Sequence, residues 1–179
     1  MYIYKVSKHT REVFKNISII GRVAYLICLF ERLLLYYKCD KEEWKIVLEK
    51  LWSVTTVQYM DEWMYEFAEY LPDSILEDTM DDAEYITESD FNYLNKVYSK
   101  TPRDILLFLE IIFDCQSVEL YTTIYDDSPG TLEKVEEGIN MLKAHNIEII
   151  SAEPFRKYSF KESGGWGKSF DGKSLSILL

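Results

Sequence analysis

The sequence has few of the residues that define crosslinked or fibrous proteins. Its 179 residues include three cysteines, seven glycines and four prolines. The cysteine count is odd and no pair has the C-x-x-C spacing, so we expect reduced thiols rather than a disulfide framework or a zinc finger. The low glycine and proline content excludes collagen-like and low-complexity architectures.

Long apolar runs are also missing. The most apolar stretch, residues 23–30, is followed directly by Glu31 and Arg32, whereas a membrane-spanning helix needs about 20 apolar residues. Basic residues interrupt the first turns, and no small-residue cleavage site follows an apolar stretch, so we expect no signal peptide. The sequence therefore predicts a soluble, cytoplasmic protein that does not enter a membrane.

Basic residues are absent from the middle of the chain. No Lys or Arg occurs between Lys50 and Lys96, and this gap contains twelve Asp and Glu residues in a chain of net charge −11. The acidic balance disfavours direct nucleic-acid binding, which needs clustered Lys and Arg. A solvated face that aids solubility is one explanation. However, twelve like charges repel one another, so we favour an electronegative surface that attracts a basic protein partner.

Apolar side chains are abundant, at 47% of the residues, with aromatics at 15%. A single domain of this length buries roughly 70% of the surface of its unfolded chain. Helical periodicity marks residues 58–71 and 131–145, whereas 17–37 and 103–124 are apolar around most of their circumference, which is typical of central helices. The sequence predicts a single-domain, all-α bundle of six or seven helices, with three tryptophans in its core: Trp44, Trp52 and Trp63.

The last 33 residues have a different pattern. We expect a helical domain over 1–146 and a C-terminal tail over 147–179 that packs on the same domain. Residues 147–151 alternate weakly and can pair with 157–161 across Pro154, which predicts an irregular tail with at most a small β-hairpin.

Motifs for catalysis or for metals are weak. Residues 167–174 match the phosphate-loop pattern G-x-x-x-x-G-K-S, but only five residues follow Ser174, too few for the helix that this loop requires. An EF-hand loop needs a glycine, and none occurs between Gly21 and Gly130. Glu-x-x-His pairs and a G-x-S-x-G elbow are also missing. We therefore expect no catalytic residues, cofactor or metal, with a nucleotide-binding enzyme as the least favoured alternative.

One segment supports a family resemblance. Residues 30–34 (FERLL), followed by Trp-containing helices and the acidic run 78–84, are similar to one of the all-α immunity protein families of bacterial polymorphic and contact-dependent toxin systems. The similarity spans residues 11–125. It implies a protein that binds and neutralises a cognate toxin made by the same cell. Many such toxins are basic nucleases, which an acidic inhibitor suits. The alternative is a helical regulatory or scaffold protein that binds another basic protein.

The candidate contact residues are chosen on charge and aromatic character alone. In the predicted helix 58–71, a rotation of 100° per residue places Glu62, Glu66 and Glu69 close together, away from the apolar face of the helix. A tryptophan between Gly165 and Gly167 either anchors a partner or fixes the tail on the core. The complete set is Asp61, Glu62, Glu66, Glu69, Asp78, Asp81, Asp82, Glu84, Tyr85 and Trp166.

Overall fold

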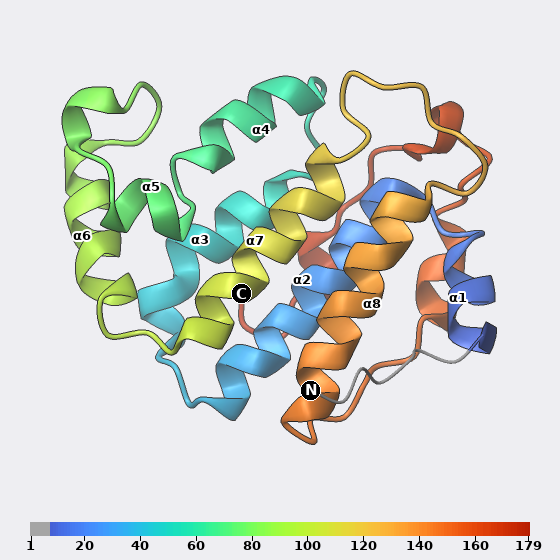
Figure 1. The fold of residues 1–179 in the computed structure, drawn as a ribbon, viewed down its shortest axis with the longest axis horizontal. Helices are drawn as coiled ribbons and strands as arrows, with labels where there is room; N and C mark the ends of the chain where they lie inside the picture. Colours follow the sequence, from blue (N-terminus) through green and yellow to red (C-terminus); the bar gives the residue numbers. More distant parts are fainter. Residues whose placement is uncertain (1–7) are drawn as a thin grey trace.

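The computed structural model describes residues 8–179, and this part of the chain is helical, with no β-sheet (Figure 1). The expectation of no signal peptide rests partly on residues 1–7 and to that extent lies outside the described residues. Seven helices have at least seven residues, and α5 is a turn of five, so the predicted all-α bundle is confirmed. The α-helical segments are α1 (Lys8–Phe14), α2 (Ile19–Tyr36), α3 (Lys41–Ser53), α4 (Met60–Ala68), α5 (Pro72–Leu76), α6 (Glu88–Tyr98), α7 (Arg103–Ser117) and α8 (Pro129–Ala144).

Helices α2, α7 and α8 pack against one another and form the centre of the fold (Figure 1). All but three of the 18 residues of α2 are buried, as the sequence predicts for a helix that is apolar around its circumference. Gly138 lets α8 approach closely, because a Cβ there would lie 2.5 Å from Leu26 Cδ2. The three tryptophans predicted for the core are at most 2% exposed. No helix in the described residues is long and apolar enough to span a membrane.

Local signals in the sequence fix several helix starts. The side chains of Ser18, Asp40 and Thr87 accept hydrogen bonds from amides in the first turns of α2, α3 and α6, at 3.0–3.2 Å. Such N-caps satisfy amides that have no partner within the helix. Pro129 is at the first position of α8, where its missing N–H costs nothing.

The tail contains short 3₁₀ turns and no hairpin. Residues 157–161 pair instead with the segment before α2: Ser18 N–H donates to Tyr158 O at 2.8 Å, and Phe160 N–H donates to Asn16 O at 3.0 Å. The expected hairpin does not form because residues Glu153–Lys157, with Pro154 at the second position, form a 3₁₀ turn in which Phe155 is buried. The backbone after that turn therefore meets the N-terminal side of α2.

Two fully buried charged side chains fasten the loops and the tail to α2. Arg22 donates from Nε to Phe14 O at 3.1 Å and from Nη1 to Asp127 O at 2.8 Å. Burial lowers the pKa of Arg22 to about 10, so it is charged at neutral pH. Glu31 accepts from Trp52 Nε1 at 2.9 Å and from Ile177 N–H at 2.7 Å. Glu31 thus joins α2 to α3 and to the end of the tail.

Candidate protein-binding surface

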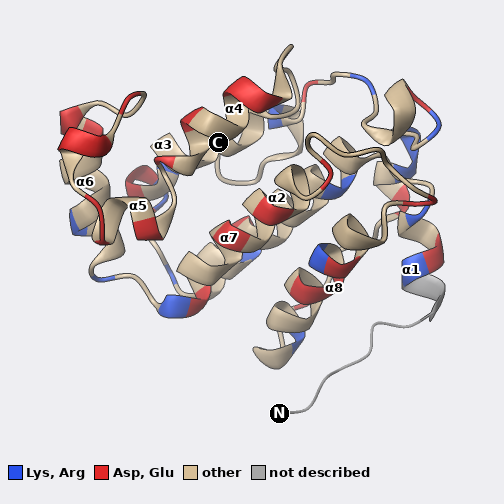
Figure 2. Ribbon diagram, turned by 45° about the horizontal axis from the view of Figure 1, so that its top comes forward, with Lys and Arg blue, Asp and Glu red and all other residues tan. Residues whose placement is uncertain are grey.

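The acidic residues of the base-free gap lie on α4 and at its C-cap, on α5, in the first turn of α6 and in the loop between α5 and α6 (Figure 2). In the part of the chain that the structure describes, only one of these twelve carboxylates forms an ion pair with Lys or Arg: Glu66 with Lys50 of α3. Eleven carboxylates have no basic partner among residues 8–179. These twelve residues form what we call the acidic surface: Asp61, Glu62, Glu66, Glu69, Asp73, Glu77, Asp78, Asp81, Asp82, Glu84, Glu88 and Asp90.

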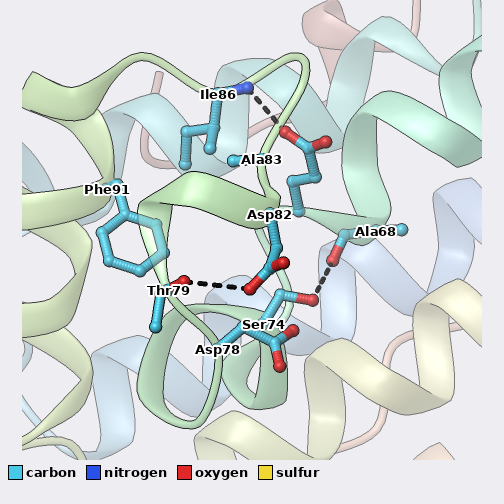
Figure 3. A pocket seen from close by; sticks show the side chains of 9 residues that line it. Ala68, Ser74, Asp78, Thr79, Asp82, Ala83, Ile86 and Phe91 are labelled. Atoms are coloured by element: carbon cyan, nitrogen blue, oxygen red, sulfur yellow. Dashed lines mark hydrogen bonds between the residues drawn. The ribbon is translucent and has the colours of Figure 1, made fainter.

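Two of the candidate contact residues have structural partners. The ion pair between Glu66 and Lys50 joins α4 to α3. Glu69 accepts three backbone hydrogen bonds of 2.7 Å, through Oε1 from Glu84 N–H and through Oε2 from the N–H groups of Tyr85 and Ile86. Figure 3 shows the bond from Ile86. Glu69 therefore holds the loop before α6 against the end of α4.

A small pocket lies beneath this loop. It has a volume of about 180 Å³ and is lined by Glu69, Asp78 and Asp82, with Ile86 and Phe91 on its apolar side (Figure 3). Asp82 accepts a hydrogen bond of 2.9 Å from Thr79 Oγ1. No group of His, Cys, Asp and Glu within the described residues is arranged to hold a metal ion.

The remaining candidates of this loop face solvent. Asp78, Asp81, Asp82 and Glu84 are exposed, and the side chain of Tyr85 is 48% exposed. The negative charge of Glu84, followed by smaller contributions from burial and from Glu69, raises the pKa of Tyr85 above its usual value. The rise is the expected effect of an electronegative neighbourhood on a group that gains negative charge.

Of the remaining candidates, Glu62 is exposed on α4. Asp61 and Trp166 both line a separate groove. This groove has a volume of about 410 Å³ and lies between the start of α4, the loop 118–128 and the tail. Glu119 and Tyr121 line it as well. Sequence reasoning missed both, because they follow an apolar helix and no motif marks them. Tyr121 is 72% exposed, and its hydroxyl lies 3.2 Å from that of Tyr65.

The glycines beside Trp166 explain how its backbone is fixed. Gly165 and Gly167 have φ angles of 102° and 88°, which L side chains rarely adopt. A Cβ on Gly167 would lie 2.4 Å from Ser18 Oγ, and the carbonyl of Trp166 accepts from Ile20 N–H at 3.2 Å. The backbone of Trp166 is thus attached to the start of α2, while the residue is only partly buried and lines the groove.

The phosphate-loop match does not have the geometry of a phosphate site. The N–H groups of Phe170 and Gly172 donate to the carbonyl and hydroxyl oxygens of Thr55, at 2.9 and 3.1 Å. Lys173 lies 3.4 Å from Glu49. Within the described chain no strand precedes this segment, and a 3₁₀ turn of three residues takes the place of the required helix.

Comparisons of the chain with protein-family models, with curated proteins and with solved structures found no match. The molecule is therefore characterised by its fold and its surface. It is an all-helical protein with a largely uncompensated acidic surface and, beside it, a groove lined by aromatic and acidic side chains.

Proposed function

We propose that this protein is an immunity protein that binds a cognate bacterial toxin with a basic surface and neutralises it. The observation that carries the proposal is that eleven of the twelve carboxylates between residues 61 and 90 have no basic partner among the described residues. Such a surface repels itself in the free protein and is compensated by Lys and Arg side chains of a partner. The resemblance of residues 30–34 and of the acidic run to immunity families supports a toxin as that partner.

The acidic surface would act mainly on the rate of association. Its carboxylates can occupy the positions of nucleic-acid phosphates on a basic nuclease, and long-range attraction accelerates the encounter in a salt-dependent way. The exposed acids Glu62, Asp78, Asp81 and Glu84 are free to contact the partner. Glu66 and Glu69 would contribute by holding α4 and the following loop in place.

The test begins with the open reading frame immediately upstream of the gene, expressed in a sensitive bacterium with and without this protein. We expect the neighbour to kill alone, and this protein to restore growth and to co-purify with it. The association rate is then measured for the variant Glu62→Lys/Asp78→Lys/Asp81→Lys. At low salt we expect this rate to fall at least about tenfold.

A matched control variant makes the same change in net charge with three substitutions that lie outside the acidic surface. Glu133→Lys/Glu148→Lys/Asp171→Lys alters three exposed acids outside the acidic surface, and its association rate should stay within about threefold of the native value. Equal effects of the two triple variants would mean that net charge, and not this surface, drives binding. A harmless neighbour would reject the immunity function and favour a regulatory or scaffold protein that binds another basic protein.

A further inference from the structure

We propose that the groove between α4, the loop 118–128 and the tail binds an arginine side chain of the partner, with the guanidinium paired to Asp61 and stacked on Trp166. The identity of the partner rests on the proposed function. The binding of an arginine side chain rests on the groove itself.

The charge of the groove selects a cation. Asp61 and Glu119 line it, and no Lys or Arg is among its described lining residues. Glu119 is held in place by the hydroxyls of Ser128 and Thr122, at 2.6 and 3.0 Å. Asp61 is partly buried and has no hydrogen-bond or ion-pair partner for its carboxylate in residues 8–179. A partly desolvated carboxylate without a partner is stabilised by an incoming cation.

The aromatic side chains select the shape of that cation. Trp166 is held by its backbone and lines the groove, and Tyr121, which is largely exposed, lines it from the neighbouring loop. A planar guanidinium stacks on such rings and pairs with a carboxylate through two parallel hydrogen bonds, whereas the compact ammonium of lysine does neither as well. Met60 and Leu120 add an apolar wall for the aliphatic part of an arginine side chain.

The position of Tyr121 is fixed by its backbone and by its neighbour on α4. Its φ of 65° is uncommon for a bulky residue, and such conformations persist only where the surroundings fix them. The hydrogen bond with Tyr65, and then smaller effects that include the charge of Asp61, raise the pKa of Tyr121 to about 12. The Tyr121 ring is therefore held near α4 and within the field of Asp61.

Trp166 also provides the signal for the experiment. The other three tryptophans, Trp44, Trp52 and Trp63, are at most 2% exposed, so Trp166 is the accessible fluorophore of the chain. The probe is an acetylated and amidated pentapeptide with a central arginine flanked by leucines. Its control replaces arginine by citrulline, which has nearly the same shape and no charge. Both are titrated into the intact protein while tryptophan emission and its quenching by acrylamide are recorded.

We expect the arginine peptide to change the emission saturably and to protect Trp166 from acrylamide, with the citrulline peptide binding about fivefold or more weakly. Asp61→Asn should reduce the affinity for the arginine peptide to that for the citrulline peptide. The matched variant Glu133→Gln removes one exposed carboxylate from α8 and should leave the affinity unchanged. Circular dichroism confirms that both variants are folded.

Equal binding of the two peptides to the native protein would overturn the proposal, and this comparison needs no variant. Undetectable binding of both, or binding that leaves Trp166 emission and quenching unchanged, would overturn it as well. The outcome is independent of the survival assay. If the arginine peptide binds but the neighbouring gene product is harmless, the proposal for the groove stands and the immunity function is rejected. If this protein rescues cells from a toxin but does not bind the arginine peptide, the immunity function stands and the proposal for the groove is rejected.

Discussion

Glu62 lies in the first turn of α4 and Glu69 is the residue that caps its end. Both are in the predicted contact set, yet the structure gives them opposite roles. Glu69 accepts three backbone hydrogen bonds of 2.7 Å from residues 84–86. Glu62 is exposed, and no side-chain partner for it occurs in residues 8–179. We therefore predict that Glu69→Gln destabilises the fold while leaving the association rate almost unchanged, and that Glu62→Gln does the reverse.

The expected loss of stability in Glu69→Gln follows from the number of hydrogen-bond acceptors that the glutamine side chain retains. Glutamine has one carbonyl oxygen, which can keep the bonds from Tyr85 and Ile86 that now end on Oε2. Its amide nitrogen then faces Glu84 N–H, so one bond is lost and the other two lose the negative charge of their acceptor. Hydrogen bonds to charged groups contribute about 1.5–3 kcal/mol and neutral ones about 0.5–1.5 kcal/mol. Because water reaches this loop, we expect a loss of about 1–3 kcal/mol in the free energy of unfolding.

Equilibrium unfolding in urea measures this difference directly. Glu62→Gln makes the same change of charge at the other end of α4 and should alter the free energy of unfolding by less than about 0.5 kcal/mol. Hydrogen exchange adds a local readout, because the amide of Glu84, which loses its bond, and those of Tyr85 and Ile86, whose bonds weaken, should exchange faster in Glu69→Gln only. Equal stability of the two variants, with unchanged exchange at these amides, would refute a structural role for Glu69.

Three further predictions concern the interior. Glu31→Gln places an amide against the N–H of Ile177 and should lower the free energy of unfolding by about 2–4 kcal/mol in urea titrations, with faster carboxypeptidase digestion of the tail. Burial raises the pKa of the Cys28 and Cys115 thiols to about 12, so in the folded protein at pH 8 Ellman's reagent should leave both unlabelled. Because both folded pKa values exceed the unfolded value, the stability that these neutral thiols contribute is complete below pH 9 and is lost as the pH rises toward 12. The urea concentration at which half of the protein is unfolded should therefore decrease as the pH is raised from 8.5 to 10.5. A constant midpoint concentration would contradict this linkage.

Helices and their starts were predictable from sequence because their causes are local. A cap such as Asp40 or Thr87 acts on amides two or three residues away. The spacing of apolar residues predicts which face of a helix is buried, and this prediction does not require knowledge of the elements that cover that face. The same reasoning located α2 as a central helix. It was less accurate for α7, because the apolar stretch 103–124 extends beyond the end of this helix at Ser117.

The candidate site was only partly predictable because charge alone does not reveal a partner. Sequence spacing treats Glu62, Glu66 and Glu69 as equivalent acids on one helix. The structure separates them through contacts with Lys50 of another helix and with a loop 15–17 residues away. The groove depends on contacts between segments more than 100 residues apart in sequence, such as Ile20 N–H to Trp166 O, and no local pattern encodes these. The expected hairpin failed for the same reason, because residues 157–161 pair with a distant segment.

The way in which the acidic segment is held together bears on its purpose. A surface that serves solubility alone can place bases among its acids and gain from the resulting ion pairs. Here the loop before α6 is held by the carboxylate of Glu69, which accepts hydrogen bonds from backbone N–H groups. The ion pair of Glu66 is formed with Lys50, the last basic residue before the base-free gap. Both devices secure the fold without a basic side chain in residues 51–95. Local structure is thus maintained while the negative potential of Glu62, Asp78, Asp81 and Glu84 remains largely uncompensated. That arrangement is expected of a surface whose counter-charges come from another molecule.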